Sequence, residues 1–236
     1  MISRCAAALL LVLAACDASP KLDTDVPGTA FPVADRPVAP IVSSTYSTEE
    51  ARDRLREADG VMDDAGVKPG MTVADIGAGA GYYTMRLAAR VGRDGRVVAQ
   101  DVMPVARDQL ADRVTREQLD NVSVKLGEPA DPMLPEHSFD RIFMVHMYHE
   151  IEQPYEFLWR LRPSLAKDGL VVVVEPDRPI MRHGTPAALL DCEFAAVGYR
   201  LVRRSSLRAV DGYLALYAAE GERPEPSAIK PCRLAD

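Results

Sequence analysis

The feature that most constrains the fold is a glycine-rich turn in the first half of the chain. Residues 73–84 read VADIGAGAGYYT, which is an apolar strand pattern, three alternating glycines and the start of a helix. Glycines at 77, 79 and 81 would let the backbone approach a nucleotide-like ligand, because side chains there would fill its volume. Tyr82 stands where the dinucleotide fingerprint G-x-G-x-x-G needs its last glycine. The turn therefore predicts a nucleotide-type ligand and argues against NAD.

Strand and helix patterns alternate after this turn, which predicts an α/β fold with a doubly wound, mostly parallel sheet. Val171 to Val174 form a continuous β-branched run, as expected for a central strand covered on both faces. Asp211-Gly212 indicates a hairpin, so the final strand should be antiparallel. We expect seven strands, near 71–76, 96–101, 121–126, 139–145, 169–175, 199–205 and 212–219. We expect helices near 51–65, 82–91, 104–118, 154–166 and 186–197.

The second predicted strand ends in an acidic residue. In RVVAQD (residues 96–101) the last residue is Asp101. A carboxylate at this position can accept hydrogen bonds from both ribose hydroxyls, which NAD and S-adenosylmethionine share. The alternative is that Asp101 only caps the helix that follows. Its position favours the ligand.

Four motifs in this order resemble the class I S-adenosylmethionine-dependent methyltransferases. They are VADIGAGAG, VVAQD, LPEHSFDRIFMVHMYHEI and LAKDGLVVVVEP, and the resemblance covers about residues 48–220. It implies the Rossmann-like methyltransferase fold with a seven-stranded sheet, and S-adenosylmethionine as cofactor. It also implies that the methionine moiety is held by Asp75, Gly77, Ala78, Gly79 and Gly81, the ribose by Asp101, and the adenine by Glu128 or Asp131.

Two departures from the family pattern concern the site. His149-Glu150 stands where small-molecule enzymes of the family often carry a His-His pair. The segment 128–131, Glu-Pro-Ala-Asp, replaces the commoner Gly-Asp-Ala, so the sequence leaves open which of its two acids meets adenine.

Polar residues follow the fourth and fifth strands, at the edge where open α/β sheets bind ligands. His146, His149 and Glu150 follow the fourth strand, and Glu175, Asp177, Arg178 and His183 follow the fifth. Methyl transfer needs an aligned acceptor and, for some acceptors, a base. We predict that His146, His149 and Glu150 fill these roles. A metal site built from the histidines and Glu150 is conceivable, but His-Met-Tyr-His-Glu is not a zincin helix, so no metal is predicted.

The N-terminus has the pattern of an export signal. An apolar run from Cys5 to Ala15 follows Arg4, too short to span a bilayer, and residues 13–16 (LAAC) resemble the bacterial lipobox. We therefore predict a signal peptide at 1–15, a tether at 16–45 anchored through lipidated Cys16, a methyltransferase domain at 46–220 and a Pro-rich tail at 221–236. The predicted location is the periplasmic side of the bacterial cell envelope. Asp17 favours the inner membrane, by a rule that holds in enterobacteria.

Charge and cysteine content bound the remaining partners. The net charge is -7 with no long basic block, which disfavours nucleic acid. Removal of the signal and lipidation of Cys16 leave Cys192 and Cys232. These form a disulfide in an oxidising compartment or remain two inert thiols, and the sequence does not decide between the two.

The expected function is methyl transfer to an unidentified small molecule. The alternative is a non-catalytic, membrane-tethered binding lipoprotein that keeps the fold. The export signal favours this alternative, because S-adenosylmethionine is made in the cytoplasm. Asp75, Asp101 and the three glycines argue against it, because a retired site would be expected to lose an acid or a glycine first.

Overall fold

The computed structural model describes residues 26–41, 48–207 and 211–233. The predicted signal peptide, Cys16 and Asp17 lie outside the described residues. Within the described part, no helix is both long and apolar enough to cross a membrane.

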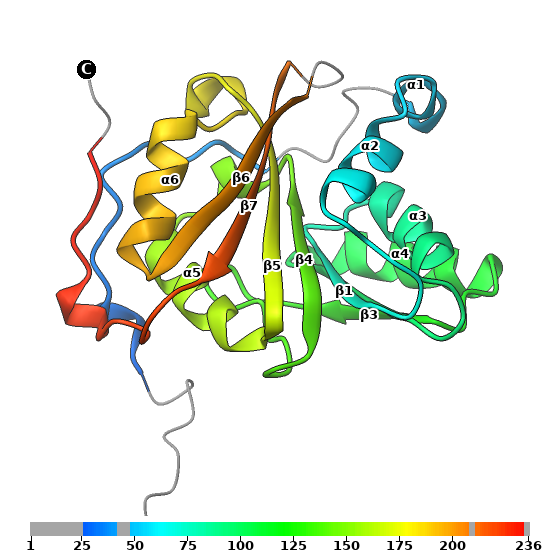
Figure 1. Ribbon diagram of the computed structural model, residues 1–236, viewed down its shortest axis with the longest axis horizontal. Coiled ribbons are helices and arrows are strands. Elements are labelled where there is room, and N and C mark those ends of the chain that lie inside the picture. Colours follow the sequence, from blue (N-terminus) through cyan, green and yellow to red (C-terminus); the bar gives the residue numbers. More distant parts are fainter. Residues whose placement is uncertain (1–25, 42–47, 208–210, 234–236) are drawn as a thin grey trace, which may run out of the picture.

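One seven-stranded sheet forms the centre of the molecule (Figure 1), which confirms the predicted fold class. Its order is β3-β2-β1-β4-β5-β7-β6, and β7 runs antiparallel to both of its neighbours, as the Asp211-Gly212 hairpin predicts. The strands are β1 (Thr72–Ile76), β2 (Arg96–Asp101), β3 (Val122–Leu126), β4 (Phe139–Val145), β5 (Leu165–Pro176), β6 (Tyr199–Leu207) and β7 (Gly212–Ala219). Strands β2 and β3 are added on one side of β1, and β4 and β5 on the other. The strand order therefore reverses between β1 and β4, and the carboxyl ends of these two strands form the topological switch point.

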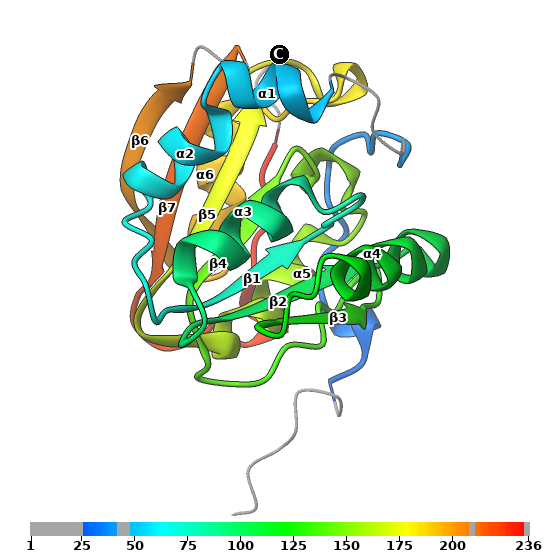
Figure 2. The same cartoon turned by 90° about the vertical axis from the view of Figure 1, so that its right-hand side faces the viewer.

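Helices cover both faces of this sheet (Figure 2). The helices are α1 (Glu49–Arg54), α2 (Glu57–Asp64), α3 (Tyr82–Val91), α4 (Pro104–Arg116), α5 (Pro154–Leu161) and α6 (Ala187–Ala196). Short 3-10 turns are η2 (Gly28–Ala30), η3 (Tyr148–Glu150), η4 (Arg162–Ser164), η5 (Ile180–Arg182) and η7 (Pro226–Ala228).

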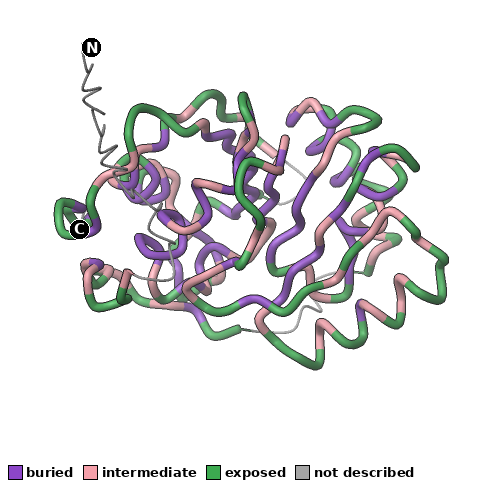
Figure 3. The backbone as a smooth tube through the Cα atoms, turned by 90° about the horizontal axis from the view of Figure 1, so that it is seen from below, coloured by how far each residue is buried: buried purple, intermediate pink, exposed green. Residues whose placement is uncertain are grey.

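The β-branched run of β5 explains how the two faces are buried. Val171 and Val173 belong to the core shared with α5 and α6, whereas Val172 and Val174 belong to the core shared with α2 and α3. All four are fully buried. Alternate side chains of a strand point to opposite faces, so a continuous apolar run serves two cores at once. Buried positions accordingly follow the central strands in Figure 3.

The helix expected at 51–65 is two helices. Thr48 caps α1 by accepting a hydrogen bond from Ala51 N (3.3 Å). Arg56 has a left-handed backbone (φ 52°), which ends α1 and turns the chain into α2. The helix expected at 154–166 also ends early, at Leu161, where the chain passes into the 3-10 turn η4. Arg162 keeps helical backbone angles, but Pro163 has no N–H with which to continue the α-helical hydrogen bonds.

Both chain ends that were expected to leave the domain pack against it where they are described. In the segment 26–41, Phe31 and Ala39 are buried. In the tail, Ile229 and Cys232 are buried, and a disulfide joins Cys232 to Cys192 of α6. These described residues of the predicted tether and of the predicted Pro-rich tail therefore pack against the domain. Their apolar side chains are too widely spaced to show a helix or strand period, but each meets the core.

Candidate active site

The glycine turn lies between the end of β1 and the start of α3. Gly77, Gly79 and Gly81 all have positive φ (66°, 52° and 87°), a backbone region that side chains disfavour. A Cβ on Gly81 would lie 2.4 Å from Leu110 Cδ1, so close packing on α4 requires glycine there. A Cβ on Gly79 would meet nothing within 4 Å. The turn is therefore packed against α4 at Gly81, whereas there is free space beside Gly79.

Two backbone contacts fasten this turn to the end of β2. Ala78 N donates to Gln100 O (3.0 Å), and Gly79 N donates to Asp101 Oδ2 (2.9 Å). Asp101 Oδ1 accepts a second bond, from Met103 N (2.8 Å). Each carboxylate oxygen still has acceptor capacity, since a carboxylate offers about four lone-pair positions. The open glycine and this carboxylate fit a nucleoside ligand of the predicted type.

Asp75 lies one residue before the end of β1 and is 3% exposed. Thr84 of α3 donates its hydroxyl to Asp75 Oδ2 (2.6 Å). Burial raises the pKa of Asp75 to about 6, against the opposing effect of the Thr84 hydrogen bond. The acid therefore exchanges its proton close to the physiological range.

The two acids considered for adenine lie in one tight loop after β3. Glu128 N donates to Asp131 O (2.9 Å), and Asp131 N donates to Glu128 O (3.1 Å). Asp131 Oδ1 accepts from Met133 N (2.7 Å), whereas the Glu128 side chain is exposed. Glu128 is thus the less constrained of the two, and its role stays a prediction.

The second half of the site follows β4 and β5. His149 is 3% exposed, and its Nδ1 lies 2.8 Å from Glu175 Oε2. Glu175 is fully buried and also accepts from Tyr148 N (3.1 Å) and the Thr185 hydroxyl (3.2 Å). A carboxylate only accepts, so His149 Nδ1 carries the proton and Nε2 is the acceptor.

The segment that carries His149 lies against the glycine turn. The Met147 side chain is so close to Gly77 that a Cβ there would be 3.0 Å from Met147 Cγ. Glu150 lies beside His149, with Oε1 4.0 Å from His149 Nε2. His183, from the loop after β5, lies edge-on to His149 with ring centroids 5.5 Å apart.

His146 does not join this cluster. Its backbone is left-handed (φ 56°), and its Nε2 lies 3.6 Å from Glu57 Oε1 on α2. Burial of Glu57 disfavours its charged form, but hydrogen bonds with His146 and Arg52 outweigh burial and lower the pKa of Glu57 to about 2. The structure thus separates the three residues predicted to be catalytic into one pair, His149 and Glu150, and His146, which faces Glu57 of α2.

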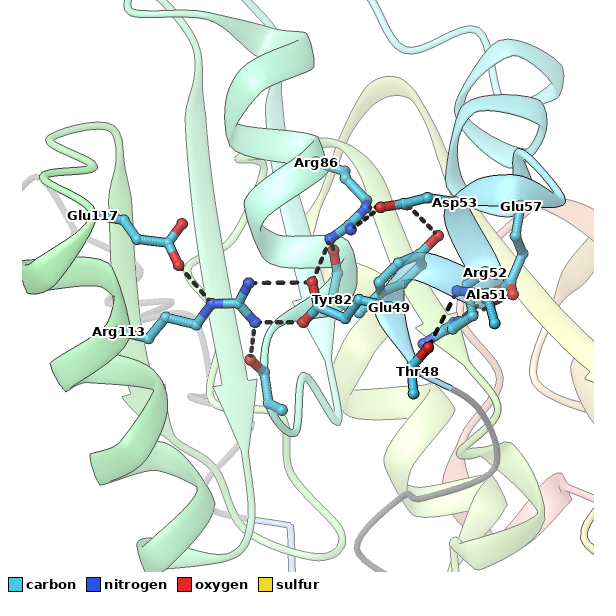
Figure 4. Close-up of polar contacts among 11 residues, drawn as sticks. Thr48, Glu49, Ala51, Arg52, Asp53, Glu57, Tyr82, Arg86, Arg113 and Glu117 are labelled. Carbon is cyan, nitrogen blue, oxygen red and sulfur yellow. Dashed lines mark hydrogen bonds and ion pairs between the residues drawn. The ribbon is translucent and has the colours of Figure 1, made fainter.

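Helix α1 is held over the turn by arginines of α3 and α4, as Figure 4 shows. Arg113 of α4 donates to Glu49 (2.6 Å) and also to Ala80 O in the glycine turn (2.8 Å). Arg86 of α3 bonds both Glu49 (3.1 Å) and Asp53 (NH2 to Oδ2, 2.5 Å). We call these four charged side chains, Glu49, Asp53, Arg86 and Arg113, the α1 clasp.

Tyr82, at the first position of α3, lies inside this arrangement. The guanidinium groups of Arg52 and Arg86 lie 3.7 and 3.8 Å from its ring centroid. Its hydroxyl donates to Asp53 (3.0 Å). The residue that breaks the dinucleotide fingerprint therefore joins α1 to the glycine turn by cation–π contacts.

Comparison with known proteins agrees with this geometry. Residues 73–169 match the family described as a methyltransferase domain. The crystal structure of a SAM-dependent methyltransferase from Aquifex aeolicus superimposes with a TM-score of 0.63 at 24% identity, over 72% of this chain and 97% of that chain. The fold is that of the S-adenosylmethionine-dependent methyltransferases.

Curated relatives of this chain are methyltransferases by name. A protein-L-isoaspartate O-methyltransferase of Methanococcoides burtonii is 31% identical over 108 residues, 45% of this chain and 50% of that protein. A ubiquinone/menaquinone biosynthesis C-methyltransferase of Idiomarina loihiensis is 28% identical over 123 residues, 50% of this chain and 48% of that protein. The chain spans about half the length of these two relatives. Their printed names differ in the atom methylated, so the acceptor does not follow from the likeness.

Several residues of the site escaped prediction. Glu175 appeared only among the polar groups after the fifth strand, although it positions His149. Arg52, Glu57 and the α1 clasp carried no signal beyond a charged helix face. The paired acids and arginines of the α1 clasp lie 33 to 64 residues apart in sequence. The acidic and basic composition of α1, α3 and α4 could have suggested pairing but not its register.

Proposed function

We propose that this chain is an S-adenosylmethionine-dependent methyltransferase that acts on a small molecule. The observation that carries the proposal is the 2.9 Å hydrogen bond from Gly79 N to Asp101, which holds the open glycine turn beside the carboxylate predicted to take the ribose. The match of residues 73–169 to a methyltransferase domain supports the same conclusion.

The residues divide the work between the two halves of the site. The cofactor would supply a methyl group on a sulfonium, and displacement there needs an acceptor held in line with that bond. The glycine turn, Asp75 and Asp101 would hold the cofactor. Met147 places the 146–150 segment beside this turn, so His149 and Glu150 are the polar groups offered to an acceptor. Glu175 fixes the orientation of the His149 ring.

We also propose that the domain works in the bacterial cell envelope, tethered through Cys16. The disulfide between Cys192 and Cys232 supports this location, since such bonds are rare where thiol reductants are abundant. The net charge of -7 and the lack of a long basic run in the sequence disfavour a nucleic-acid acceptor.

Calorimetric titration of the purified full chain with S-adenosylmethionine tests the proposal. We expect micromolar binding, about -8 kcal/mol. Asp101→Asn should weaken it by a factor of ten or more, because hydrogen bonds to a charged acceptor contribute about 1.5 to 3 kcal/mol.

Asp112→Asn is the matched control, since Asp112 is an exposed acid on α4 outside the site. It should bind like the unmodified protein. Folded protein with no measurable affinity, or equal loss in both variants, would overturn the proposal.

A further inference from the structure

Three metal-ligating side chains converge at the carboxyl edge of β4 and β5. His149, Glu150 and His183 each offer one ligand atom, and these atoms all lie within 4.8 Å of one another. They come from two separate loops, one after β4 and one after β5. His149 is buried, and the other two are partly exposed.

The carboxylate behind His149 is the second observation. Glu175 holds His149 Nδ1 at 2.8 Å, leaving Nε2 directed away from it, on the side of Glu150. Histidines that bind metal almost always donate their other ring N–H to a carboxylate, a carbonyl or water, which fixes the tautomer and raises ligand basicity. Glu175 is itself held by Tyr148 N and Thr185 Oγ1. Glu175 thus orients His149 as a metal ligand would be oriented, and Tyr148 and Thr185 hold Glu175 in place.

We propose that His149, Glu150 and His183 bind a divalent transition-metal ion, with zinc the expected metal. Two imidazoles and one carboxylate are a donor set of catalytic zinc sites. Zinc–ligand bonds of about 2.0 to 2.1 Å in a tetrahedron place ligand atoms about 3.3 Å apart. Ligand atoms that lie within 4.8 Å of one another therefore need to close by up to about 1.5 Å, and His149 Nε2 and Glu150 Oε1, which are 4.0 Å apart, by less.

The sequence contains no local metal-binding motif, because the three ligands come from two separate segments. His183 lies 34 residues after His149, and only the parallel alignment of β4 and β5 brings their loops together. A helical zincin spacing is one way to place two histidines on one ion. Two adjacent strand ends are another.

Three protein ligands leave a fourth zinc position open. Resting on the proposed methyl transfer, we assign this position to the methyl acceptor, which would be a hydroxyl or thiol compound. A bound cation lowers the pKa of such a group and so favours its nucleophilic form. His149 then serves as a ligand in place of the base predicted from the sequence.

Titration of the chelator-treated full chain with zinc chloride alone tests the ion site. We expect one equivalent to bind with micromolar or tighter affinity. His183→Gln and Glu150→Gln should each weaken binding at least 100-fold. His137→Gln is the matched control, because His137 is exposed and lies before β4, at the opposite end of that strand. It should leave zinc affinity unchanged.

The role of Glu175 in positioning His149 is tested by a separate variant. Glu175→Gln keeps all three ligands and should weaken zinc binding by 10- to 100-fold. Circular dichroism and thermal unfolding of each variant identify any that fail to fold. No zinc binding by the folded protein, or His183→Gln and Glu150→Gln variants that bind zinc as tightly as the unmodified protein, would overturn the site.

Failure of this inference is distinguishable from failure of the proposed function. S-adenosylmethionine is titrated into the same preparation with the metal removed. Cofactor binding without zinc binding would leave the methyltransferase proposal intact and reject the ion. Zinc binding without cofactor binding would do the reverse.

Discussion

At the scale of single residues, the carboxylates near the ends of β1 and β2 differ in their hydrogen-bond donors and in the effect of burial. Asp101 accepts two backbone amides, from Gly79 and Met103. Asp75 accepts the Thr84 hydroxyl and is almost fully buried, so burial dominates and raises its pKa to about 6. An acid kept this deep in the core costs stability whenever it is ionised.

This cost predicts a pH-dependent difference between the protein and Asp75→Asn. Because the pKa of Asp75 in the folded protein lies above its ordinary value of 3.8, the folded state binds the proton more tightly than the unfolded state. The Asp75 contribution to the free energy of unfolding is therefore greatest below pH 4 and is lost as the pH rises to about 6. Relative to Asp75→Asn, the protein should lose about 2 kcal/mol between pH 4 and pH 7.

Urea unfolding of both proteins at several pH values measures this difference directly. Asp112→Asn, which removes an exposed acid, should show no comparable change. Stability curves of Asp75→Asn and the protein that run parallel across this range would mean that the carboxyl titrates normally in the fold.

Residue identities predicted the cofactor half of the site better than the acceptor half. Positive φ favours glycine at 77, 79 and 81, and close packing favours it also at 77 and 81, so the glycine spacing in the sequence already indicates this turn. Glu175 and His183 are ordinary residue types whose meaning comes from their neighbours. Only the alignment of strand ends places them beside His149, and no local pattern encodes that.

At the scale of elements, α1 is a short helix held mainly by charges. It has six residues, none of them buried, so little apolar packing keeps it in place. The α1 clasp ties it to α3, to α4 and, through Arg113, to the glycine turn. Each partly exposed ion pair contributes only about 0.2 to 1 kcal/mol. Helix α1 is therefore a cover that should open easily.

Removing one clasp residue should raise the population of open α1. Glu49 accepts from both Arg86 and Arg113, so Glu49→Gln weakens two ion pairs, a loss of about 1 kcal/mol. Amide hydrogens of α1 should then exchange roughly fivefold faster, while those of β1 keep their rates. Hydrogen exchange followed by mass spectrometry or NMR measures both.

Glu117→Gln is the control for this change. Glu117 pairs with the same Arg113 (2.8 Å) but belongs to the end of α4 and does not touch α1 (Figure 4). Equal acceleration in both variants would mean that Arg113 positions α1 through α4 alone and not through Glu49.

The segment 26–41 is held by a buried ion pair. Arg36 Nε lies 2.8 Å from Glu193 Oε1 on α6, and both side chains are 1% exposed. Arg36 also donates to Ile151 O (3.0 Å), and Glu193 accepts from the Tyr148 hydroxyl (2.7 Å). Burial raises the pKa of Glu193, against the effect of Arg36.

Arg36→Met should therefore destabilise the protein by about 3 to 5 kcal/mol, because it leaves Glu193 buried without its cation. Arg36→Met combined with Glu193→Gln should recover part of this loss. Arg203→Met removes an exposed pair with Asp64 of similar length (2.6 Å) and should cost under about 1 kcal/mol. Equal effects of Arg36→Met and Arg203→Met in chemical denaturation would contradict a structural role for the segment.

At the scale of the whole molecule, the features that can be predicted from the sequence are those set by residues close together in the chain. The seven strands and their order of appearance come from hydrophobic runs and turn residues, which are local signals, and the structure matches them. The packing of 26–41 and of the tail depends on single side chains such as Phe31 and Ile229 meeting a distant core. Proline-rich composition suggested a tether before the domain and a tail after it, but a few buried apolar side chains suffice to fix segments that have little regular structure.

The disulfide between Cys192 and Cys232 fixes the tail to α6 covalently, and removing it tests how much this link stabilises the fold. Cys192 and Cys232 are 40 residues apart, and the closed loop contains β6, β7 and the start of the tail. Restricting a loop of this length in the unfolded chain stabilises the fold by up to about 4 kcal/mol. We expect reductant, or Cys192→Ser with Cys232→Ser, to lower the urea midpoint accordingly. Reductant should not affect the double variant, which controls for other effects of thiols. An unchanged midpoint would mean that tail packing alone carries the stability, whereas the expected loss would measure how strongly this fold depends on an oxidising compartment.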